Sequence, residues 1–185
     1  MILNENLLQT IKSFLNLDFE VCGSIKDHES SSGNKIILEI HSQYKEKVKD
    51  EDVEKSHCYH LSYSKYIFHT HPYYSKSYPS ATDIIKVMNN SIIISSLIFT
   101  KWGIWEIYSA KKMKFNDIQK AETKEILNKF LKGIYENTDG GRADVVNYEL
   151  IEGYIKKIEF FYKKFGLEIN LTPWSRIVDY DIIFV

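Results

Sequence analysis

The hydrophobic pattern at the start of the chain predicts one helix followed by two strands. Apolar residues recur at helical spacing between residues 4 and 17, which is typical of an amphipathic helix with one face in the core. β-prone runs then cover residues 19–25 and 35–41, and the turn-forming residues 30–34 lie between them. We therefore expect these two runs to pair as antiparallel strands. Residues 43–56 are densely charged, which predicts a solvated loop or a short exposed helix.

The middle of the chain contains the most strand-like segments. Strands are predicted over residues 58–62, 66–71, 92–99 and 104–108. The run 92–99 is the most apolar and suits the middle of a sheet, with 104–108 returning as its hairpin partner. An amphipathic helix is predicted to begin at Ser80 and to end at Asn89-Asn90.

The C-terminal part of the chain is mainly helical in its pattern. Two helices are predicted, roughly over residues 117–135 and 144–165, with Gly166 as a C-cap for the second. A final strand is expected from Ile177 to Val185. The last helix carries four aromatic residues that we expect in the core, or alternatively in a protein-binding surface: Phe160, Phe161, Tyr162 and Phe165. Together the patterns predict an α/β fold in which helices pack on a mixed β-sheet.

Length and composition limit the classes of function. The 185 residues suit one domain over residues 1–185, with a core at about 4–110 and a helical and strand extension at 115–185. With 24 basic and 25 acidic residues the net charge is −1, so we expect neither nucleic acid nor a membrane as a partner. Two cysteines, no secretory signal and no apolar run of about 18 residues predict a soluble intracellular protein, by default cytoplasmic. The oligomeric state is left open.

The stretch from residue 66 to residue 83 carries the candidate chemistry. A strand that delivers His69 and His71 points both imidazoles to one face, with their α-carbons about 6 to 7 Å apart. Pro72 has no N–H for a ladder, so the chain must turn there. Ser80 then reads as a helix N-cap, and Asp83 in the first turn can aim a carboxylate back at the strand end. These residues predict a zinc site with His69, His71 and Asp83 as ligands.

The ligand types favour a catalytic zinc site over a structural one. Two imidazoles and one carboxylate leave a tetrahedral position open for water, whereas structural sites close all four positions, usually with thiolates. The alternative is that His69 and His71 are ordinary histidines at a strand end, with Ser80 and Asp83 serving only as a helix cap and a first-turn acid. Capping and metal binding are compatible, because a cap also orients a ligand.

Three further features are weaker evidence for a functional site. Glu20 is an acidic residue flanked by apolar ones, so it lies either on a solvent face or in a site. Cys22 shares its face if the strand is regular, and we interpret it as a packing residue. A second possible metal cluster, closed and structural in type, consists of His57, Cys58 and His60 with His41.

The order Glu20, His69-Thr-His71-Pro72, Ser80-x-x-Asp83 resembles the JAMM (MPN-plus) zinc metallopeptidases, and Glu20-Val-Cys-Gly23 is similar to the first strand of that family. The resemblance covers about residues 4–110 and implies the JAMM/MPN, cytidine-deaminase-like fold. The loop from Pro72 to Pro79 is one residue longer than is usual in the family. We expect the ligand geometry to survive this insertion.

The resemblance also implies a division of roles. His69, His71 and Asp83 would hold Zn²⁺, which lowers the pKa of bound water to near 7. Glu20 would act as the general base and then as the general acid toward the leaving amine. Ser80 would stabilise the oxyanion of the tetrahedral intermediate.

Three functions follow as hypotheses. The first is a JAMM-type isopeptidase that cleaves the bond after the C-terminal glycine of ubiquitin or a ubiquitin-like protein, with residues 43–56 and the 72–79 loop as candidate substrate contacts. The second is a non-catalytic MPN-type scaffold or binding module. The third is a zinc peptidase that acts on small peptides or their conjugates.

Overall fold

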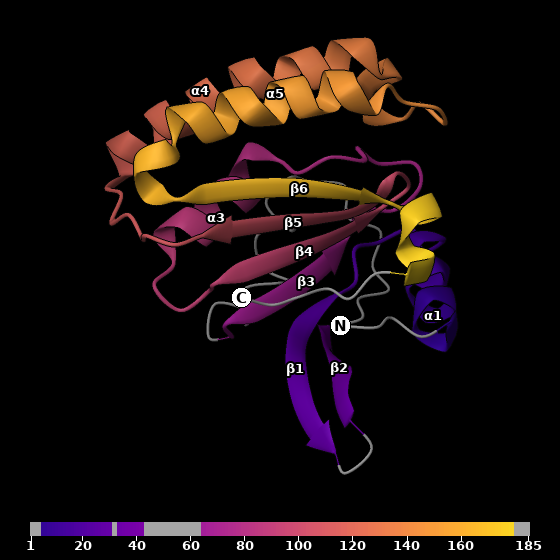
Figure 1. The fold of residues 1–185 in the computed structure, drawn as a ribbon. Helices are drawn as coiled ribbons and strands as arrows, with labels where there is room; N and C mark the ends of the chain where they lie inside the picture. The colour runs from indigo at the N-terminus through magenta and orange to yellow at the C-terminus, as the bar shows by residue number, and fades with distance from the viewer. Residues whose placement is uncertain (1–4, 31–32, 43–63, 180–185) are drawn as a thin grey trace.

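The computed structural model describes residues 5–30, 33–42 and 64–179 (Figure 1). Its helices are α1 (Glu5–Leu15), α3 (Ala81–Asn89), α4 (Asp117–Asn137) and α5 (Tyr148–Phe161), with short 3-10 helices η2 (Asp139–Gly141), η3 (Lys163–Phe165) and η4 (Trp174–Asp179). Its strands are β1 (Cys22–Ser30), β2 (Gly33–Ser42), β3 (Tyr66–Thr70), β4 (Ser95–Thr100), β5 (Gly103–Ser109) and β6 (Leu167–Pro173).

All six of these strands belong to one mixed sheet in the order β2-β1-β3-β4-β5-β6. β3 and β4 are parallel and are joined through α3, whereas the other neighbouring pairs are antiparallel. A parallel pair needs a crossover connection, and the helix after β3 supplies it. The sheet confirms the predicted α/β class with a mixed sheet and packed helices. It also includes β6, so the C-terminal part of the chain contributes a strand to the same sheet.

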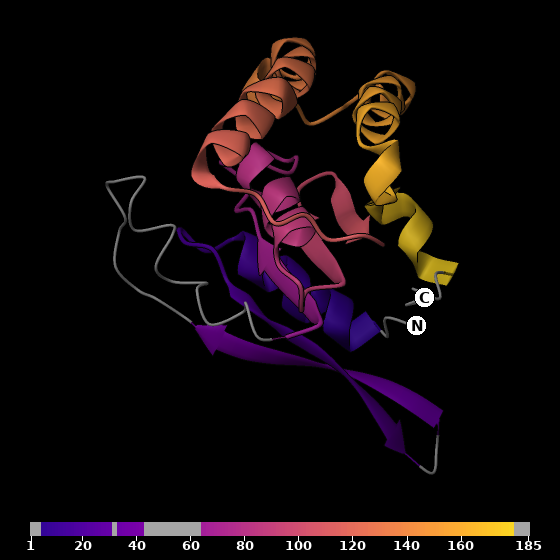
Figure 2. The ribbon, with the colours of Figure 1, turned by 90° about the vertical axis from the view of Figure 1, so that its left-hand side faces the viewer.

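Helices cover both faces of the sheet (Figure 2). One core cluster joins α3, α4 and α5 to the sheet, with Trp105 as its largest fully buried side chain. The other joins α1 and η4 to the opposite face around Phe68 and Phe99. Side chains alternate between the two cores along β3, since Ile67 faces the α3 side and Phe68 the α1 side. Every residue of β4 is buried, as expected for a central strand.

The β1–β2 hairpin extends beyond the other strands of the sheet (Figure 1). Only Cys22 to Ser24 of β1 pair with β3, whereas the whole of β1 pairs with β2. The hairpin therefore projects from the body of the protein. Its start is nevertheless fixed, because this short pairing joins β1 to the strand that carries His69.

Several predicted boundaries change. β1 begins at Cys22, so Glu20 precedes the strand, and the strand predicted from residue 92 begins at Ser95. The predicted helix 144–165 divides into α5 and η3, and Gly166 follows as a left-handed cap with φ of 60°. β6 was not predicted, although its alternating burial is the usual strand signature. The predicted strand from Ile177 is wrong for residues 177–179, which lie in η4.

The aromatic residues at the end of α5 do not all enter the core. Tyr162 is buried, but Phe160 and Phe161 are 81% and 51% exposed, so the core prediction is wrong for these two. The predictions for residues 43–56, 58–62 and 180–185 lie outside the described residues. No helix among those described combines the length and the hydropathy that a membrane span requires.

Candidate metal centre

His69 lies near the carboxyl end of β3 and faces the layer formed by α3. It follows Ile67 by two residues, so the alternation of the strand places both side chains on the same face. In the register of β1 and β3 it lies opposite Cys22, a fully buried member of the core below α3. His69 itself is 8% exposed. The imidazole is therefore held at the edge of the core rather than in solvent.

His71 lies immediately beyond the strand, yet the sheet still fixes its backbone. Its N–H donates to the carbonyl of Phe99 in β4 at 2.8 Å. Its ring nitrogen Nδ1 lies 2.8 Å from the carbonyl oxygen of Lys76. Because a carbonyl can only accept, Nδ1 carries a hydrogen, and in the neutral form of the ring Nε2 is the nitrogen with the lone pair. A histidine held in this way is the form that binds a metal through Nε2.

Asp83 is placed by the first turn of α3. Ser80 is the N-cap, and its hydroxyl oxygen accepts a hydrogen bond from the Asp83 backbone N–H at 3.2 Å. In return, Oδ2 of Asp83 accepts hydrogen bonds from the backbone N–H and from the hydroxyl of Ser80, both at 2.7 Å. This capping box satisfies free N–H groups at the helix start. It also fixes the carboxylate, leaving Oδ1 directed at His69.

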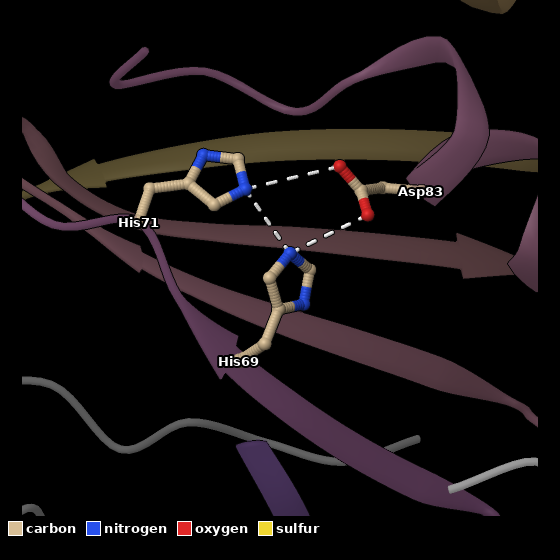
Figure 3. A group of neighbouring side chains, drawn as sticks. All are labelled: His69, His71 and Asp83. Carbon is tan, nitrogen blue, oxygen red and sulfur yellow. Dashed lines mark hydrogen bonds and ion pairs between the residues drawn. The ribbon is translucent and has the colours of Figure 1, made fainter. Parts of the chain in front are cut away.

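The three side chains converge on one point (Figure 3). Nε2 of His69 lies 3.1 Å from Nε2 of His71 and 3.4 Å from Oδ1 of Asp83. Nε2 of His71 lies 3.9 Å from Oδ2 of Asp83. Two ligand atoms on one tetrahedral zinc lie about 3.4 Å apart, given zinc–ligand distances of about 2.0–2.1 Å. The donor types and their spacing therefore fit a cation of this kind, and we conclude that this cluster could hold a metal ion.

The protonation states also suit a metal ligand set. Burial lowers the pKa of His69 from 6.5 to about 4, against the opposing effect of Asp83, so the imidazole is neutral near pH 7. Burial alone would raise the pKa of Asp83, but His69, His71 and the hydrogen bonds from Ser80 outweigh it and lower the pKa. The carboxylate is therefore ionised. A neutral imidazole, as at His69, and an ionised carboxylate, as at Asp83, are forms that bind divalent metals.

Glu20 is brought to the same site by the pairing of β1 with β3. The backbone N–H of Thr70 donates to the carbonyl of Val21 at 2.9 Å, and the Val21 N–H donates to the Thr70 hydroxyl at 2.8 Å. This pairing places Glu20 beside His71, and its Oε1 lies 3.8 Å from Nε2 of that histidine. The Glu20 side chain is 29% exposed, so it is accessible from solvent.

All five predicted site residues therefore lie together. Three of them form the cluster and two border it. His69, His71 and Asp83 form the cluster, and Glu20 borders it on the side of His71. Ser80 also borders it, but its hydroxyl is bonded to the Asp83 carboxylate. In this position Ser80 orients the candidate ligand Asp83. Its predicted role toward an oxyanion stays a prediction.

Sequence reasoning missed two neighbours of the site. Lys86 follows Asp83 by three residues on α3, and its helical spacing is a signal that could have identified it. Burial lowers the pKa of Lys86, while Asp83 and Glu20 act in the opposite direction. Nothing in the sequence could have identified the Lys76 carbonyl that holds His71, because every residue has a backbone carbonyl.

The other predicted features have different outcomes. Cys22 is fully buried in the core, but its sulfur is part of a disulfide bond, so the interpretation as a packing residue alone is incomplete. Of the second possible cluster, His41 lies in β2, whereas His57, Cys58 and His60 lie outside the described residues. That site stays a prediction.

A cavity of about 290 Å³ lies apart from the metal cluster, between α5, β6 and η4. Apolar side chains such as Ile155 and Leu171 line it together with charged ones such as Glu159 and Arg176. The described residues that line it include no histidine or cysteine and none of the five predicted site residues. We therefore place the candidate chemistry at the end of β3.

Comparison with known proteins adds no assignment to this geometry. The chain matches no protein-family model, no curated protein and no solved structure.

Proposed function

We propose that this protein is a zinc-dependent hydrolase of the JAMM type, and that it cleaves the bond after the C-terminal glycine of ubiquitin or a ubiquitin-like protein. The observation that carries the proposal is the convergence of His69, His71 and Asp83, with Glu20 beside them. The three ligands come from a strand end and the following helix, and the fourth group comes from a distant part of the chain. A chance histidine pair at a strand end would not require this arrangement.

The ligand set favours a catalytic metal site over a purely structural one. Among the described residues the cluster offers three ligand atoms, so with these alone a tetrahedral metal would keep one position open, as catalytic zinc sites do. When bound, zinc would supply a Lewis acid and water of lowered pKa. The mixed sheet with helices on both faces is compatible with the JAMM/MPN fold that the resemblance implies.

Glu20 is the residue that we assign to proton transfer. Its carboxylate borders the cluster and is partly exposed, so a water molecule and a substrate amine can both approach it. A general base must lie within hydrogen-bonding distance of the proton that it removes, directly or through one water. Glu20 would then take a proton from water and deliver it to the leaving amine.

In this proposal the Ser80 hydroxyl has two roles, and it cannot perform both at the same time. Its hydroxyl donates to Oδ2 of Asp83 at 2.7 Å, which keeps the ligand carboxylate in place. To stabilise an oxyanion, the hydroxyl would have to turn away from Asp83. The backbone N–H of Ser80, also 2.7 Å from Oδ2, would continue to hold the carboxylate during that rotation.

The loop after His71 supplies a surface for the substrate. Tyr73 and Tyr74 are 38% and 55% exposed, and they directly follow Pro72. Burial, then Asp18 and Glu20, raise the pKa of Tyr74, which places this side chain in the electrostatic field of the proposed base. Exposed aromatic side chains are frequent anchors for peptide partners. We assign them to contact with the extended C-terminal tail of the substrate.

The first experiment is the metal content of purified protein by mass spectrometry. Wild type should hold about one zinc per chain, and the His69→Ala, His71→Ala double variant should hold none. A His28→Ala variant is the control, because His28 lies far along β1, opposite Lys35 of β2. Absence of zinc from wild type after zinc is supplied would contradict the proposal and favour the non-catalytic scaffold.

A second experiment separates the two possible substrates of a zinc enzyme. Wild type is incubated with a panel of ubiquitin-like proteins that carry a C-terminal amide-linked reporter, and with short peptides of the same terminal sequence. Cleavage of the protein conjugates alone supports the proposal. Equal cleavage of the short peptides would favour a peptidase for small conjugates.

A further inference from the structure

The loop that follows His71 is attached to the C-terminal part of the chain through Ser77. The backbone N–H of Ser77 donates to the carbonyl of Gly141 in η2 at 2.9 Å. The carbonyl of Ser77 accepts a hydrogen bond from the indole N–H of Trp105 in β5 at 2.8 Å. Ser77 is 1% exposed, so both bonds are buried. This residue is therefore fixed between β5 and the connection of α4 to α5.

Gly141 is required at its position for two independent reasons. Its φ is +85°, in the left-handed region that side chains disfavour. A β-carbon at this position would also lie 2.6 Å from Cε1 of Tyr78 and 3.4 Å from the Cα of Lys76. The connection can approach the loop this closely only because residue 141 has no side chain.

The neighbour of Ser77 holds the metal ligand. The carbonyl of Lys76 accepts a hydrogen bond from Nδ1–H of His71 at 2.8 Å. The Gly141 carbonyl accepts the N–H of the Lys76–Ser77 peptide group. The carbonyl of that same peptide group fixes the ring and the Nδ1 hydrogen of His71. Partners of this kind are known to orient the histidines of metal sites.

The connection itself is anchored and can act as a support. The indole N–H of Trp102 donates to the carbonyl of Ala143 at 2.8 Å, and Nζ of Lys101 donates to that of Arg142 at 2.9 Å. The ring of Tyr78 stacks on that of Trp102, with centroids 6.3 Å apart. The β4–β5 turn therefore holds the connection of α4 to α5 and the loop after His71 together.

We propose that Gly141 is a positioning residue of the metal centre, and that through Ser77 and Lys76 it holds His71 with Nδ1 protonated and Nε2 free for a metal. The inference rests on the proposed function only in taking His71 as a ligand. It assigns to the helical pair α4 and α5 a direct part in supporting the site. Substitution of Gly141 should therefore disturb His71 more than it disturbs the fold.

The test is a comparison of two glycines that share a backbone conformation. Gly141→Ala introduces the contact with Tyr78. Gly140→Ala carries comparable backbone strain, with φ of +65°, but the nearest atoms to its β-carbon would belong to Tyr135, the first at 3.4 Å. Both variants are compared with wild type by thermal unfolding. Long-range ¹H–¹⁵N spectra of the metal-free proteins report the tautomer of His71, and titration reports zinc affinity.

We expect Gly141→Ala to move the His71 nitrogen signals away from the Nδ1-protonated pattern and to weaken zinc binding by about 10- to 100-fold. Gly140→Ala should keep the wild-type pattern and affinity. Wild-type His71 signals in a folded Gly141→Ala protein, or equal changes in both variants, would overturn the inference. Replacing Tyr78 by Leu in the Gly141→Ala background should restore part of the pattern, because it removes Cε1, the atom closest to the new β-carbon.

A second variant decides the question if Gly141→Ala does not fold. Trp102→Phe removes the donor to the Ala143 carbonyl and keeps an aromatic ring against Tyr78. Changed His71 signals in this variant support the inference, and unchanged signals overturn it. The nitrogen spectra need no metal, so absence of zinc from wild type would refute the proposed function without deciding the role of Gly141.

Discussion

Oε1 of Glu20 lies 3.8 Å from Nε2 of His71, although the two residues are far apart in the sequence. The register of β1 and β3 produces this contact, since it pairs Cys22 with His69, and Glu20 and His71 each lie two residues beyond that pair. The proposed general base and a candidate metal ligand are thus brought together by the sheet. Local sequence alone could not have done so.

The replacement Glu20→Gln should separate metal binding from turnover. Glutamine keeps the size of the side chain but cannot accept the proton, so cleavage should fall by at least about 10²- to 10⁴-fold. Zinc content and thermal unfolding should stay at the wild-type level. The control is Asp18→Asn, an exposed carboxylate near the same loop. Unchanged turnover in Glu20→Gln would rule out the assignment of Glu20 as general base.

Ser80 should be needed for zinc affinity as well as for the stability of α3. Ser80→Ala removes the N-cap hydroxyl, which should cost about 1 kcal/mol of unfolding free energy. It also removes one of the two hydrogen bonds from Ser80 to Oδ2 of Asp83, so zinc should bind about 10- to 100-fold more weakly. Ser80→Thr should restore both properties, because threonine also caps. Thr82→Ala, an exposed change in the same turn, serves as the control.

Asp83→Asn should lower zinc affinity further than Ser80→Ala does. The amide removes the negative charge that the two histidines stabilise, and it cannot accept hydrogen bonds at both atoms of the group. Zinc titration of the three proteins under one condition gives the order. An affinity for Asp83→Asn equal to that of wild type would show that Asp83 is not a ligand.

The metal-free protein should lose stability as the pH falls from 6.5 to about 4. Burial lowers the pKa of His69 to about 4 in the fold, while the unfolded chain keeps the ordinary value of 6.5. Between these values the unfolded chain binds a proton that the folded chain does not. The contribution of neutral His69 to the free energy of unfolding is therefore fully present above pH 6.5. It falls by on the order of 3 kcal/mol toward pH 4. The Asp83 pKa is lowered from 3.8, so its contribution is lost only at still lower pH.

Denaturant unfolding of metal-free wild type and His69→Gln measures this dependence. The variant has no imidazole at position 69, so its free energy of unfolding should change less between pH 6.5 and 4. Parallel curves for the two proteins would contradict the assignment to His69.

Tyr74 should affect substrate binding without affecting the metal. Tyr74→Ala removes an exposed ring next to the site, and we expect KM to rise about tenfold, a change of about 1.4 kcal/mol, at unchanged kcat and zinc content. Phe160→Ala, on the exposed surface of α5, is the control and should leave KM unchanged. A fall in kcat at constant KM would place Tyr74 in the catalytic step instead.

Much of the site was predictable because it is built from local signals. The strand that carries His69 and His71 follows from an apolar run that Pro72 ends, and the helix cap follows from Ser80 and Asp83 three residues apart. The central position of β4 follows from its apolar composition. Each of these depends on residues that are neighbours in the chain.

The strand that sequence reasoning missed shows the limit of local signals. Leu167 and Ile169 are buried and alternate with the exposed Glu168 and Asn170, but the segment directly follows the aromatic end of a helix. Its partner is β5, far back in the chain, and this pairing provides the hydrogen bonds that make it a strand. Phe160 and Phe161 were misplaced for a related reason, since only the packing of α5 decides which of its faces is buried.

The sequence by itself determined the types of the candidate ligands, their spacing on one strand and one helix turn, and the mixed α/β character. Only the tertiary structure decided that Glu20 meets His71 and that Gly141 lies against the loop after it. Strand register and helix docking join residues that are distant in the chain, and their free energy depends on the whole core rather than on any local pattern. The supporting groups at His71 are backbone atoms, which every residue carries, so only the fold determines which of them hold the site.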